Sequence, residues 1–218
     1  MMSRLAGPIL GVLGFFLVAA LATSGCDKTA PSSSQPNEVI AFGDSLVYGL
    51  GTTSGNNFVS LLSQRLSIDI RNAGFPGDTT ASALARLNNS VLSRNPRLVI
   101  VLLGANDLFT GVPVPQRVSN ITSIVQQIRA KGAKVVLVGL TVDASQDPFE
   151  GALTAIASQT SSSFVPGLLD GWYGDPVFMA ADGDHPNNAG HKIMADRIEP
   201  VLRTALMSSQ AAQFVTAR

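Results

Sequence analysis

The chain has 218 residues, 45% of them apolar, and its 15 basic residues balance its 15 acidic ones. No cluster of Lys and Arg alternates with aromatic residues, which excludes the phosphate-binding surface of a nucleic-acid-binding protein. A single Cys excludes an intrachain disulfide, and one Cys with two His is too few ligands for a structural zinc site, so the sequence implies no metal and no cofactor.

The N-terminus has the pattern of a secretory signal peptide, so residues 1–25 are left out of the predicted fold. Arg4 precedes a long apolar run. Small residues and then Cys26 follow that run, which resembles a bacterial lipobox, in which the cysteine becomes lipidated and N-terminal; Thr23 stands where that motif prefers leucine. Two alternatives stay open: ordinary signal-peptide cleavage at residues 20–22, or an apolar run that remains as an uncleaved anchor.

Residues 26–37 are rich in Ser and Pro and contain nothing to bury, as expected for a flexible tether. Lipid on Cys26 together with this tether predicts an exported protein, held as a lipoprotein on the periplasmic side of a bacterial membrane. A soluble periplasmic or secreted protein is the alternative.

The next part of the chain alternates short apolar runs with helical patterns. The runs that indicate buried strands are residues 39–42, 68–72, 98–103 and 135–138. Apolar residues recur at helical spacing between them, in residues 58–66, 83–92 and 118–128. Because parallel strands need helical crossovers, this order predicts an α/β fold: a doubly wound, flavodoxin-like parallel sheet of about five strands with helices on both faces.

The pattern weakens towards the C-terminus. Residues 143–151 are predicted as a loop, residues 152–158 as a helix and residues 164–165 as the last strand, whereas nothing in the sequence assigns residues 160–180.

A final helix follows this unassigned segment. Asn187 and Asn188 are suited to cap it, and Pro200 is expected to kink or end it. The folded domain is therefore predicted to span residues 38–208, with residues 209–218 frayed.

Polar residues or glycine follow three of the predicted strands. Ser45 comes after the first strand, Gly74 after the second and Asn106 after the third. The carboxyl ends of parallel strands meet at one edge of a sheet, where open α/β sheets bind their ligands, so these residues are expected to lie close together. A serine at such a turn is suited to nucleophilic acyl transfer when a base lies within hydrogen-bonding reach.

Two histidines are available as that base. His185 lies in a loop three residues after Asp182, whose carboxylate is expected to fold back onto the second ring nitrogen and fix the tautomer. Asp184 competes for this role but is adjacent to His185, and adjacent side chains tend to diverge. His191 is expected on the surface of the final helix or in local packing. The residues therefore predict Ser45 as nucleophile, His185 as general base and Asp182 as its orienting acid.

Four segments, in order, resemble the signature blocks of the SGNH (GDSL) hydrolase family: Gly43-Asp44-Ser45-Leu46, Gly74, Gly104-Ala105-Asn106-Asp107 and Asp182-x-x-His185-Pro186. The resemblance covers about residues 38–205 and implies a three-layer α/β/α fold. Within the family the chain is most similar to the bacterial periplasmic arylesterase, thioesterase I and lysophospholipase branch, through Gly77-Asp78-Thr79-Thr80, Ala85-Arg86-Leu87 and His185-Pro186-Asn187.

The resemblance also implies roles for individual residues. It gives the serine, histidine and aspartate named above the same roles in a catalytic triad. It forms the oxyanion hole from the backbone N–H groups of Ser45 and Gly74 and the side-chain amide of Asn106. Asp44 and Asp107 are expected to be structural, with carboxylates that accept backbone N–H groups and hold the two turns.

Apolar residues flank these turns and are candidates for an acyl-binding groove. They include Phe75, Leu108 and Phe109, for which packing in the core or in loops is an equally good interpretation. No long insertion indicates a lid, which favours a broad esterase over a lipase with a narrow substrate range.

The predicted function is that of a serine ester hydrolase that cleaves aryl and short- to medium-chain acyl esters, with thioesters and lysophospholipids as further substrates. An acetylesterase of cell-envelope polysaccharide and a catalytically inactive envelope-binding module are the alternatives. The expected partners are a small-molecule or lipid ester and, through the N-terminal lipid, a membrane; the sequence indicates no nucleic acid and no obligate protein partner.

Overall fold

The structure is a computed structural model that describes residues 37–141 and 148–215, all within one compact unit spanning residues 34–218. The predicted signal peptide, the lipidation of Cys26 and most of the tether lie outside the described residues and stay predictions.

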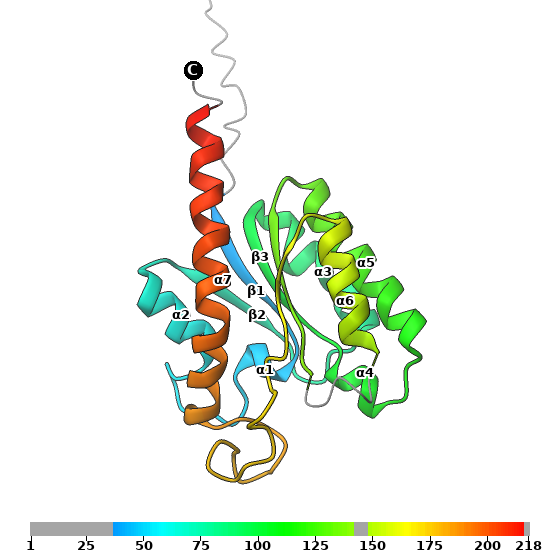
Figure 1. Cartoon of the computed structure of the whole chain (residues 1–218), viewed down its shortest axis with the longest axis vertical. Helices are drawn as coiled ribbons and strands as arrows, with labels where there is room; N and C mark the ends of the chain where they lie inside the picture. Colours follow the sequence, from blue (N-terminus) through cyan, green and yellow to red (C-terminus); the bar gives the residue numbers. More distant parts are fainter. Residues whose placement is uncertain (1–36, 142–147, 216–218) are drawn as a thin grey trace, which may run out of the picture. The chain divides into compact units, whose positions relative to one another are not determined.

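The described residues form a parallel sheet of five strands in the order β2-β1-β3-β4-β5 (Figure 1). The strands are β1 (Glu38–Gly43), β2 (Ile70–Gly74), β3 (Pro96–Leu102), β4 (Lys134–Val138) and β5 (Ser163–Val165). The predicted doubly wound α/β sheet is therefore confirmed. The strand order reverses at β1, which lies between β2 and β3, and open α/β sheets bind ligands at such a switch point.

Helices connect the strands and cover both faces of the sheet. They are α1 (Ser45–Tyr48), α2 (Phe58–Leu66), α3 (Thr80–Ser90), the 3-10 turn η1 (Leu92–Arg94), α4 (Ala105–Phe109), α5 (Val114–Ala130), α6 (Phe149–Gln159) and α7 (Asn188–Val215). Figure 1 shows α2 and α7 on one side of the strands and α3, α5 and α6 on the other. Among the described helices none is both long and apolar enough to cross a membrane.

The uninterrupted apolar runs of the central strands follow from burial on both faces. Successive side chains of a strand point to opposite faces, so Val39 and Ala41 of β1 pack in the core beneath α2 and α7, whereas Ile40 and Phe42 pack beneath α3 and α5. The residues of β3 alternate in the same way between the two cores. Two apolar layers therefore hold the carboxyl ends of β1 and β3 in fixed positions.

Several predicted boundaries differ from the structure. Strand β2 begins at Ile70, two residues later than the predicted 68–72, and α6 begins at Phe149, inside the segment predicted as a loop. Pro200 does not end α7, which is described as far as Val215. The helix continues because its apolar face, which includes Ile198 and Leu202, is buried against the sheet and outweighs the loss of one backbone hydrogen bond.

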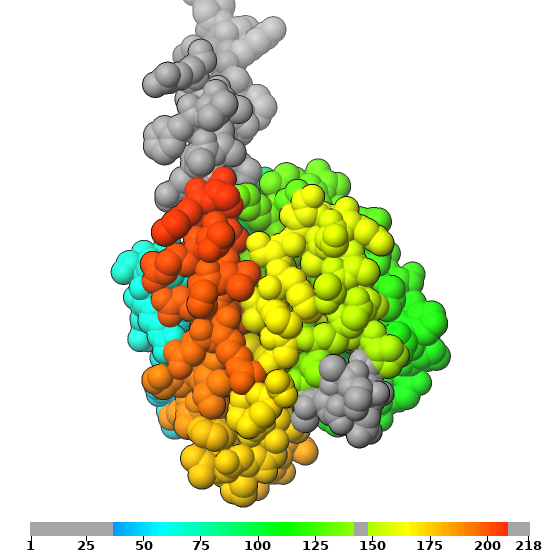
Figure 2. Space-filling model, in the orientation of Figure 1, coloured from blue at the N-terminus to red at the C-terminus, as the bar shows by residue number. Residues whose placement is uncertain are grey.

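The segment that the sequence left unassigned is a loop from 166 to 187 that leads from β5 to α7. It is anchored by its own apolar side chains: Trp172 is buried in the core and meets the ring of Phe178 edge-on, with ring centroids 6.1 Å apart. An antiparallel bridge between Met179 and Pro186 closes its last part. Figure 2 shows this loop, in yellow to orange, at the end of the domain where α7 begins.

Candidate active site

The candidate catalytic side chains gather at the carboxyl ends of the strands. Ser45 is the first residue of α1, directly after β1, and the N-terminus of this helix is capped by the carboxylate of Asp44, which accepts the N–H of Leu46 at 3.0 Å. Asn106 lies in α4, directly after β3, and His185 lies at the end of the loop before α7. The sheet therefore brings together residues that are far apart in the sequence.

Ser45, His185 and Asp182 form one hydrogen-bonded chain, as the sequence predicted. His185 Nε2 lies 3.1 Å from Ser45 Oγ, and His185 Nδ1 lies 2.8 Å from Asp182 Oδ2. The other carboxylate oxygen of Asp182 accepts the backbone N–H groups of Asp184 at 3.1 Å and of His185 at 3.0 Å. This geometry puts the Nδ1 proton on the side of the carboxylate and leaves Nε2 free to accept a proton from the serine.

Asp182 is held in its ionised form. The backbone N–H of His185, followed by the hydrogen bond from its ring, lowers the pKa of the Asp182 carboxyl to about 2. A carboxylate that stays charged at neutral pH can stabilise the imidazolium that forms when His185 takes a proton.

The two competing candidates have other positions. Asp184 lies beside the site, but the hydrogen bond it makes there is through its backbone carbonyl, which accepts the hydroxyl of Tyr173 at 3.0 Å. His191 is fully buried in α7; its Nδ1 accepts the N–H of Phe58 at 3.1 Å and its ring stacks on the Phe58 ring. Burial lowers the pKa of His191 to about 4, so it is neutral at neutral pH. Of the two predicted positions for His191, packing is confirmed.

Asp44 is fully buried next to the nucleophile. Burial raises the pKa of its carboxyl to about 7. The N–H of Leu46 lowers this pKa by a smaller amount, and the nearby negative charge of Asp78 raises it. One of its carboxylate oxygens has no hydrogen-bond partner. The predicted structural role is supported by the other oxygen, which caps α1.

Replacing Asp44 by asparagine is expected to remove a pH-dependent loss of stability. The folded state binds the proton of Asp44 more tightly than the unfolded chain does, because the pKa rises from 3.8 to about 7 on folding. The wild type should therefore lose roughly 1.4 kcal/mol per pH unit relative to the variant as the pH rises through this window. Denaturant unfolding at several pH values measures the difference, with Asp69→Asn on the exposed surface as control; parallel curves for Asp44→Asn and wild type contradict it.

The structure corrects the prediction that Gly74 belongs to the oxyanion hole. Its N–H donates to the side-chain oxygen of Asn72 at 2.9 Å and is therefore engaged. A Cβ on Gly74 would collide with the backbone of α1 at Tyr48, so the absent side chain is required for the close approach of β2 and α1. Gly74 has a packing role.

Gly77, in the same connection between β2 and α3, has the unused backbone N–H that Gly74 lacks. Gly77 has a φ of +83° in the turn where the N–H of Asp78 donates to the carbonyl of Phe75 at 3.2 Å. None of the hydrogen bonds among the described residues uses the N–H of Gly77. The side-chain amide of Asn106 donates to the carbonyl of Asp78 at 2.9 Å, which brings Asn106 beside this turn.

Two buried polar pairs hold these turns in position. The carboxylate of Asp107 accepts the backbone N–H of Thr80 at 2.8 Å and its hydroxyl at 2.6 Å, which confirms the predicted structural role. The Arg86 guanidinium pairs with Asp78 and donates to the carbonyls of Gly43 at 2.9 Å and Ala73 at 3.0 Å. The sequence motif that contains Arg86 indicates no role for it, because nothing in the local pattern shows that this side chain reaches two strand ends.

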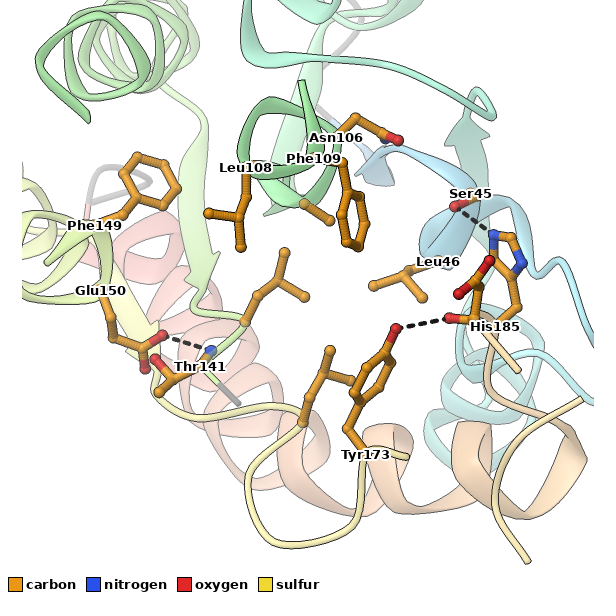
Figure 3. A pocket seen from close by; sticks show the side chains of 15 residues that line it. Ser45, Leu46, Asn106, Leu108, Phe109, Thr141, Phe149, Glu150, Tyr173 and His185 are labelled. Atoms are coloured by element: carbon orange, nitrogen blue, oxygen red, sulfur yellow. Dashed lines mark hydrogen bonds between the residues drawn. The ribbon is translucent and has the colours of Figure 1, made fainter. Parts of the chain in front are cut away.

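An apolar cavity of about 690 Å³ opens beside Ser45 (Figure 3). Figure 3 shows Ser45, Asn106 and His185 on one side of it and Phe149, Glu150 and Thr141 on the other. The apolar side chains that line it are Leu46, Leu108, Phe109, Leu140, Phe149, Leu169 and Tyr173. The Glu150 carboxylate accepts the N–H groups of Thr141 and Gly167, at 2.9 and 2.6 Å, and so ties together the segments that follow β4 and β5.

The three residues proposed for the substrate groove have different positions. Leu108 and Phe109 line the cavity and are 54% and 75% exposed, as a binding surface requires. Phe75 does not line it; its ring lies 5.8 Å from the guanidinium of Arg86, outside the cavity. The predicted groove role is therefore supported for Leu108 and Phe109 and not for Phe75. Within the described ranges no three His, Cys, Asp or Glu side chains are grouped as a metal site needs.

Comparison with known proteins agrees with this geometry. Residues 41–193 match the model of the GDSL-like lipase/acylhydrolase family. Esterase TesA of Pseudomonas aeruginosa is 33% identical over 199 residues, which cover 86% of this chain and 99% of that protein. Thioesterase 1/protease 1/lysophospholipase L1 of Escherichia coli is 27% identical over 165 residues, 72% of this chain and 79% of that one.

A solved structure gives the same result for the fold. The crystal structure of TesA superposes with a TM-score of 0.72 at 33% identity, covering 78% of this chain and 99% of that chain. The family match over residues 41–193 includes the segments that carry Ser45, Asn106 and His185. The chain therefore belongs to the GDSL-like lipase/acylhydrolase family and is an ester hydrolase.

Proposed function

We propose that this enzyme hydrolyses carboxylic esters with aryl leaving groups and short- to medium-chain acyl groups through an acyl-enzyme on Ser45. The observation that carries the proposal is the hydrogen-bonded chain of Ser45, His185 and Asp182 at the mouth of an apolar cavity. A binding module without catalysis would not need this chain intact, which argues against that alternative.

The geometry leads to a two-step reaction. Ser45 Oγ attacks the ester carbon while its proton passes to His185 Nε2; the bond to the leaving oxygen then breaks, and that oxygen takes the proton from His185. A water molecule repeats the sequence on the acyl-enzyme: its proton goes to His185, its oxygen bonds to the acyl carbon, and Ser45 recovers the proton. The products are a carboxylic acid and an alcohol, phenol or thiol.

The oxyanion that forms at each step needs donors. The N–H of Ser45 is suited to this role because the first residue of α1 has no acceptor within the helix. The amide of Asn106 has a second N–H besides the one bound to the carbonyl of Asp78. We infer that Gly77 supplies the third donor in place of Gly74, because its N–H is unused and lies in the turn that Asn106 contacts.

The cavity supports an acyl chain as its occupant. Its lining is apolar on both sides between Ser45 and Phe149, so an alkyl chain is buried there more favourably than a sugar ring. This favours acyl esters over acetylated polysaccharide as substrates. Thioesters and lysophospholipids carry the same acyl group and are further candidates, in agreement with the name of the Escherichia coli relative.

Phe109→Ala is expected to weaken the binding of medium-chain esters. The side chain lines the cavity, and its loss removes apolar surface that an acyl chain would cover, so KM for p-nitrophenyl octanoate should rise about fivefold with little change in kcat. Initial rates over a range of substrate concentrations measure both constants. Phe75→Ala, an exposed phenylalanine outside the cavity, is the matched control, and an equal rise in KM for both variants would contradict the role of Phe109.

Two measurements test the proposed function. Rapid quenching during turnover of a p-nitrophenyl ester, followed by intact-mass and peptide analysis, should find the acyl group on Ser45. An acyl group on another residue, or hydrolysis without any acyl group on the protein, would contradict the acyl-enzyme on Ser45. A panel of aryl esters, acyl thioesters, lysophospholipids and acetylated glycan ranks the substrates. Activity confined to acetylated glycan would favour the polysaccharide acetylesterase instead.

We also propose export and lipidation at Cys26, on the strength of the apolar N-terminal run and the position of the chain's single cysteine. Replacing Cys26 by serine should release active enzyme into the soluble periplasmic fraction or stall its processing, because stable anchoring requires two or three acyl chains. Cell fractionation with an activity assay measures this. A Cys26→Ser protein that matures and stays with membranes as the wild type does would favour an uncleaved anchor.

A further inference from the structure

Charge is distributed unevenly between the two edges of the sheet. The described connections after the strands, which form the catalytic edge, contain no Lys or Arg. Their charged residues are acidic, and four of them are exposed on the surface: Asp170, Asp175, Asp182 and Asp184. An anionic surface would therefore be repelled from this edge.

The opposite edge, where the strands begin, is basic around the starts of β3 and β4. We call this surface the basic edge and define it by five residues just before or at the start of these strands: Arg94, Arg97, Arg129, Lys131 and Lys134. Arg129 and Lys134 lie near each other, since the pKa of Lys134 is lowered by burial and then by the positive charge of Arg129. Arg94 lies on the side towards β2, where it lines a small groove with Arg71 and Arg86.

None of these five residues has a carboxylate partner among the described residues. Four basic side chains elsewhere on the surface each form an ion pair with an acidic residue: Arg65, Arg71, Lys192 and Arg203. Glu38, at the start of β1 beside Pro96, pairs with Arg71 and with none of these five residues. The positive charge of the basic edge is therefore uncompensated.

The chain enters the folded domain at this same edge. Glu38 begins β1 next to Pro96, the first residue of β3, and Arg97 Nε donates to the backbone carbonyl of Asn37 at 3.1 Å. Figure 1 shows the start of β1 at the edge opposite α1 and α4. Any anchor carried by the preceding residues is thus connected to the domain beside the basic edge, and not beside the active site.

From these two observations we propose that the basic edge docks onto an anionic lipid surface. Lys and Arg attract anionic headgroups when they lie within about 10 Å of the surface, and a tether that enters at the same edge keeps them there. The bound enzyme then turns its catalytic edge away from the supporting bilayer. Substrate reaches Ser45 from the aqueous side, and the acidic catalytic edge is kept from the anionic headgroups.

Vesicle binding by the hydrolase domain tests this without any contribution from an anchor. Residues 34–218 form one compact unit, and 78% of this chain covers 99% of the solved TesA chain. Residues 34–218 should sediment with vesicles of phosphatidylglycerol and phosphatidylcholine in equal parts, and not with phosphatidylcholine alone. Binding should weaken as salt is raised, since screening shortens the range of the attraction.

Single substitutions locate the surface. Lys131→Gln should lower the vesicle partition coefficient about fivefold, and Arg94→Gln with Lys131→Gln about 25-fold; both side chains are exposed and bind no other described residue. Lys192→Gln removes the same charge from an ion pair on α7 and should leave binding unchanged. Hydrolysis of p-nitrophenyl butyrate should be equal in all of these proteins, which separates this proposal from the proposed function.

Three results overturn the proposal: equal binding to neutral and anionic vesicles, equal binding by Lys131→Gln and wild type, or retention on heparin and DNA at salt concentrations that abolish vesicle binding. The last result would assign the basic edge to a polyanion other than a membrane.

Discussion

Ser45→Ala is expected to lower kcat for p-nitrophenyl butyrate by ~10⁴- to 10⁶-fold and to leave KM nearly unchanged. The variant keeps the cavity and the backbone donors but has no Oγ to form the acyl-enzyme, so only water activated at a distance remains as nucleophile. Initial rates at saturating substrate measure the effect.

The matched control is Ser158→Ala, which makes the same chemical change at an exposed position of α6 far from the nucleophile in sequence. It should retain wild-type kcat. Unfolding curves of Ser45→Ala that coincide with the wild type exclude misfolding as the cause. A Ser45→Ala protein with more than about a hundredth of wild-type kcat would show that another group is the nucleophile.

Asp182→Asn is expected to reduce kcat by ~10³- to 10⁴-fold. Asparagine can turn its NH₂ group towards His185 Nδ1, which then accepts a hydrogen bond. The ring proton therefore moves to Nε2, and a protonated Nε2 cannot accept the proton of Ser45. Nuclear magnetic resonance of the imidazole nitrogens reports the tautomer directly, and kinetics report its consequence. A purely structural role would lower stability without changing the tautomer.

Asp184→Asn is the control for this change, because it removes a neighbouring carboxylate that lines the cavity but is not part of the hydrogen-bonded chain of Ser45, His185 and Asp182. Its kcat should stay within about threefold of the wild type, as expected for an exposed charge whose interactions are screened by solvent. A larger loss in Asp184→Asn than in Asp182→Asn would mean that the two acids exchange roles in solution.

The sheet was predictable because buried parallel strands have a simple signature. Burial on both faces makes β1, β3 and β4 continuous apolar runs, and the helices between them have apolar residues at helical spacing. Strand β2 lacks this signature, since Arg71 and Asn72 are exposed at the edge of the sheet, and its predicted boundary was two residues too early. Edge strands are constrained by pairing more than by burial.

The boundaries that failed depend on contacts distant in sequence. Phe149 looks like part of a loop after Pro148, yet it begins α6 because its ring is buried against the turn at Gly104 and the guanidinium of Arg117. Pro200 is a helix breaker by local rules, and α7 continues through it because the surrounding apolar residues are buried. Neither contact can be predicted from the residues that neighbour Phe149 or Pro200 in the sequence.

The candidate site was predictable where position in the chain was enough. Three strand ends and a loop with an aspartate three residues before a histidine gave the serine, the histidine and the aspartate. The assignment of Gly74 to the oxyanion hole failed because it depends on whether its backbone N–H already has an acceptor. That acceptor is the side chain of Asn72, which the sequence pattern predicts only as part of a strand. The ring of Phe75 likewise lies near Arg86, a residue on another element.

Trp172, buried against Phe178 in the loop that carries His185, is the single tryptophan of the whole chain. Its indole N–H donates to the carbonyl of Leu168 at 3.1 Å, so the ring is held by the loop's own backbone. Intrinsic fluorescence therefore reports on one place in the molecule, the support of the general base. A red shift in emission that precedes the loss of helical circular dichroism during unfolding would show that the loop carrying His185 unfolds while the rest of the domain is still folded.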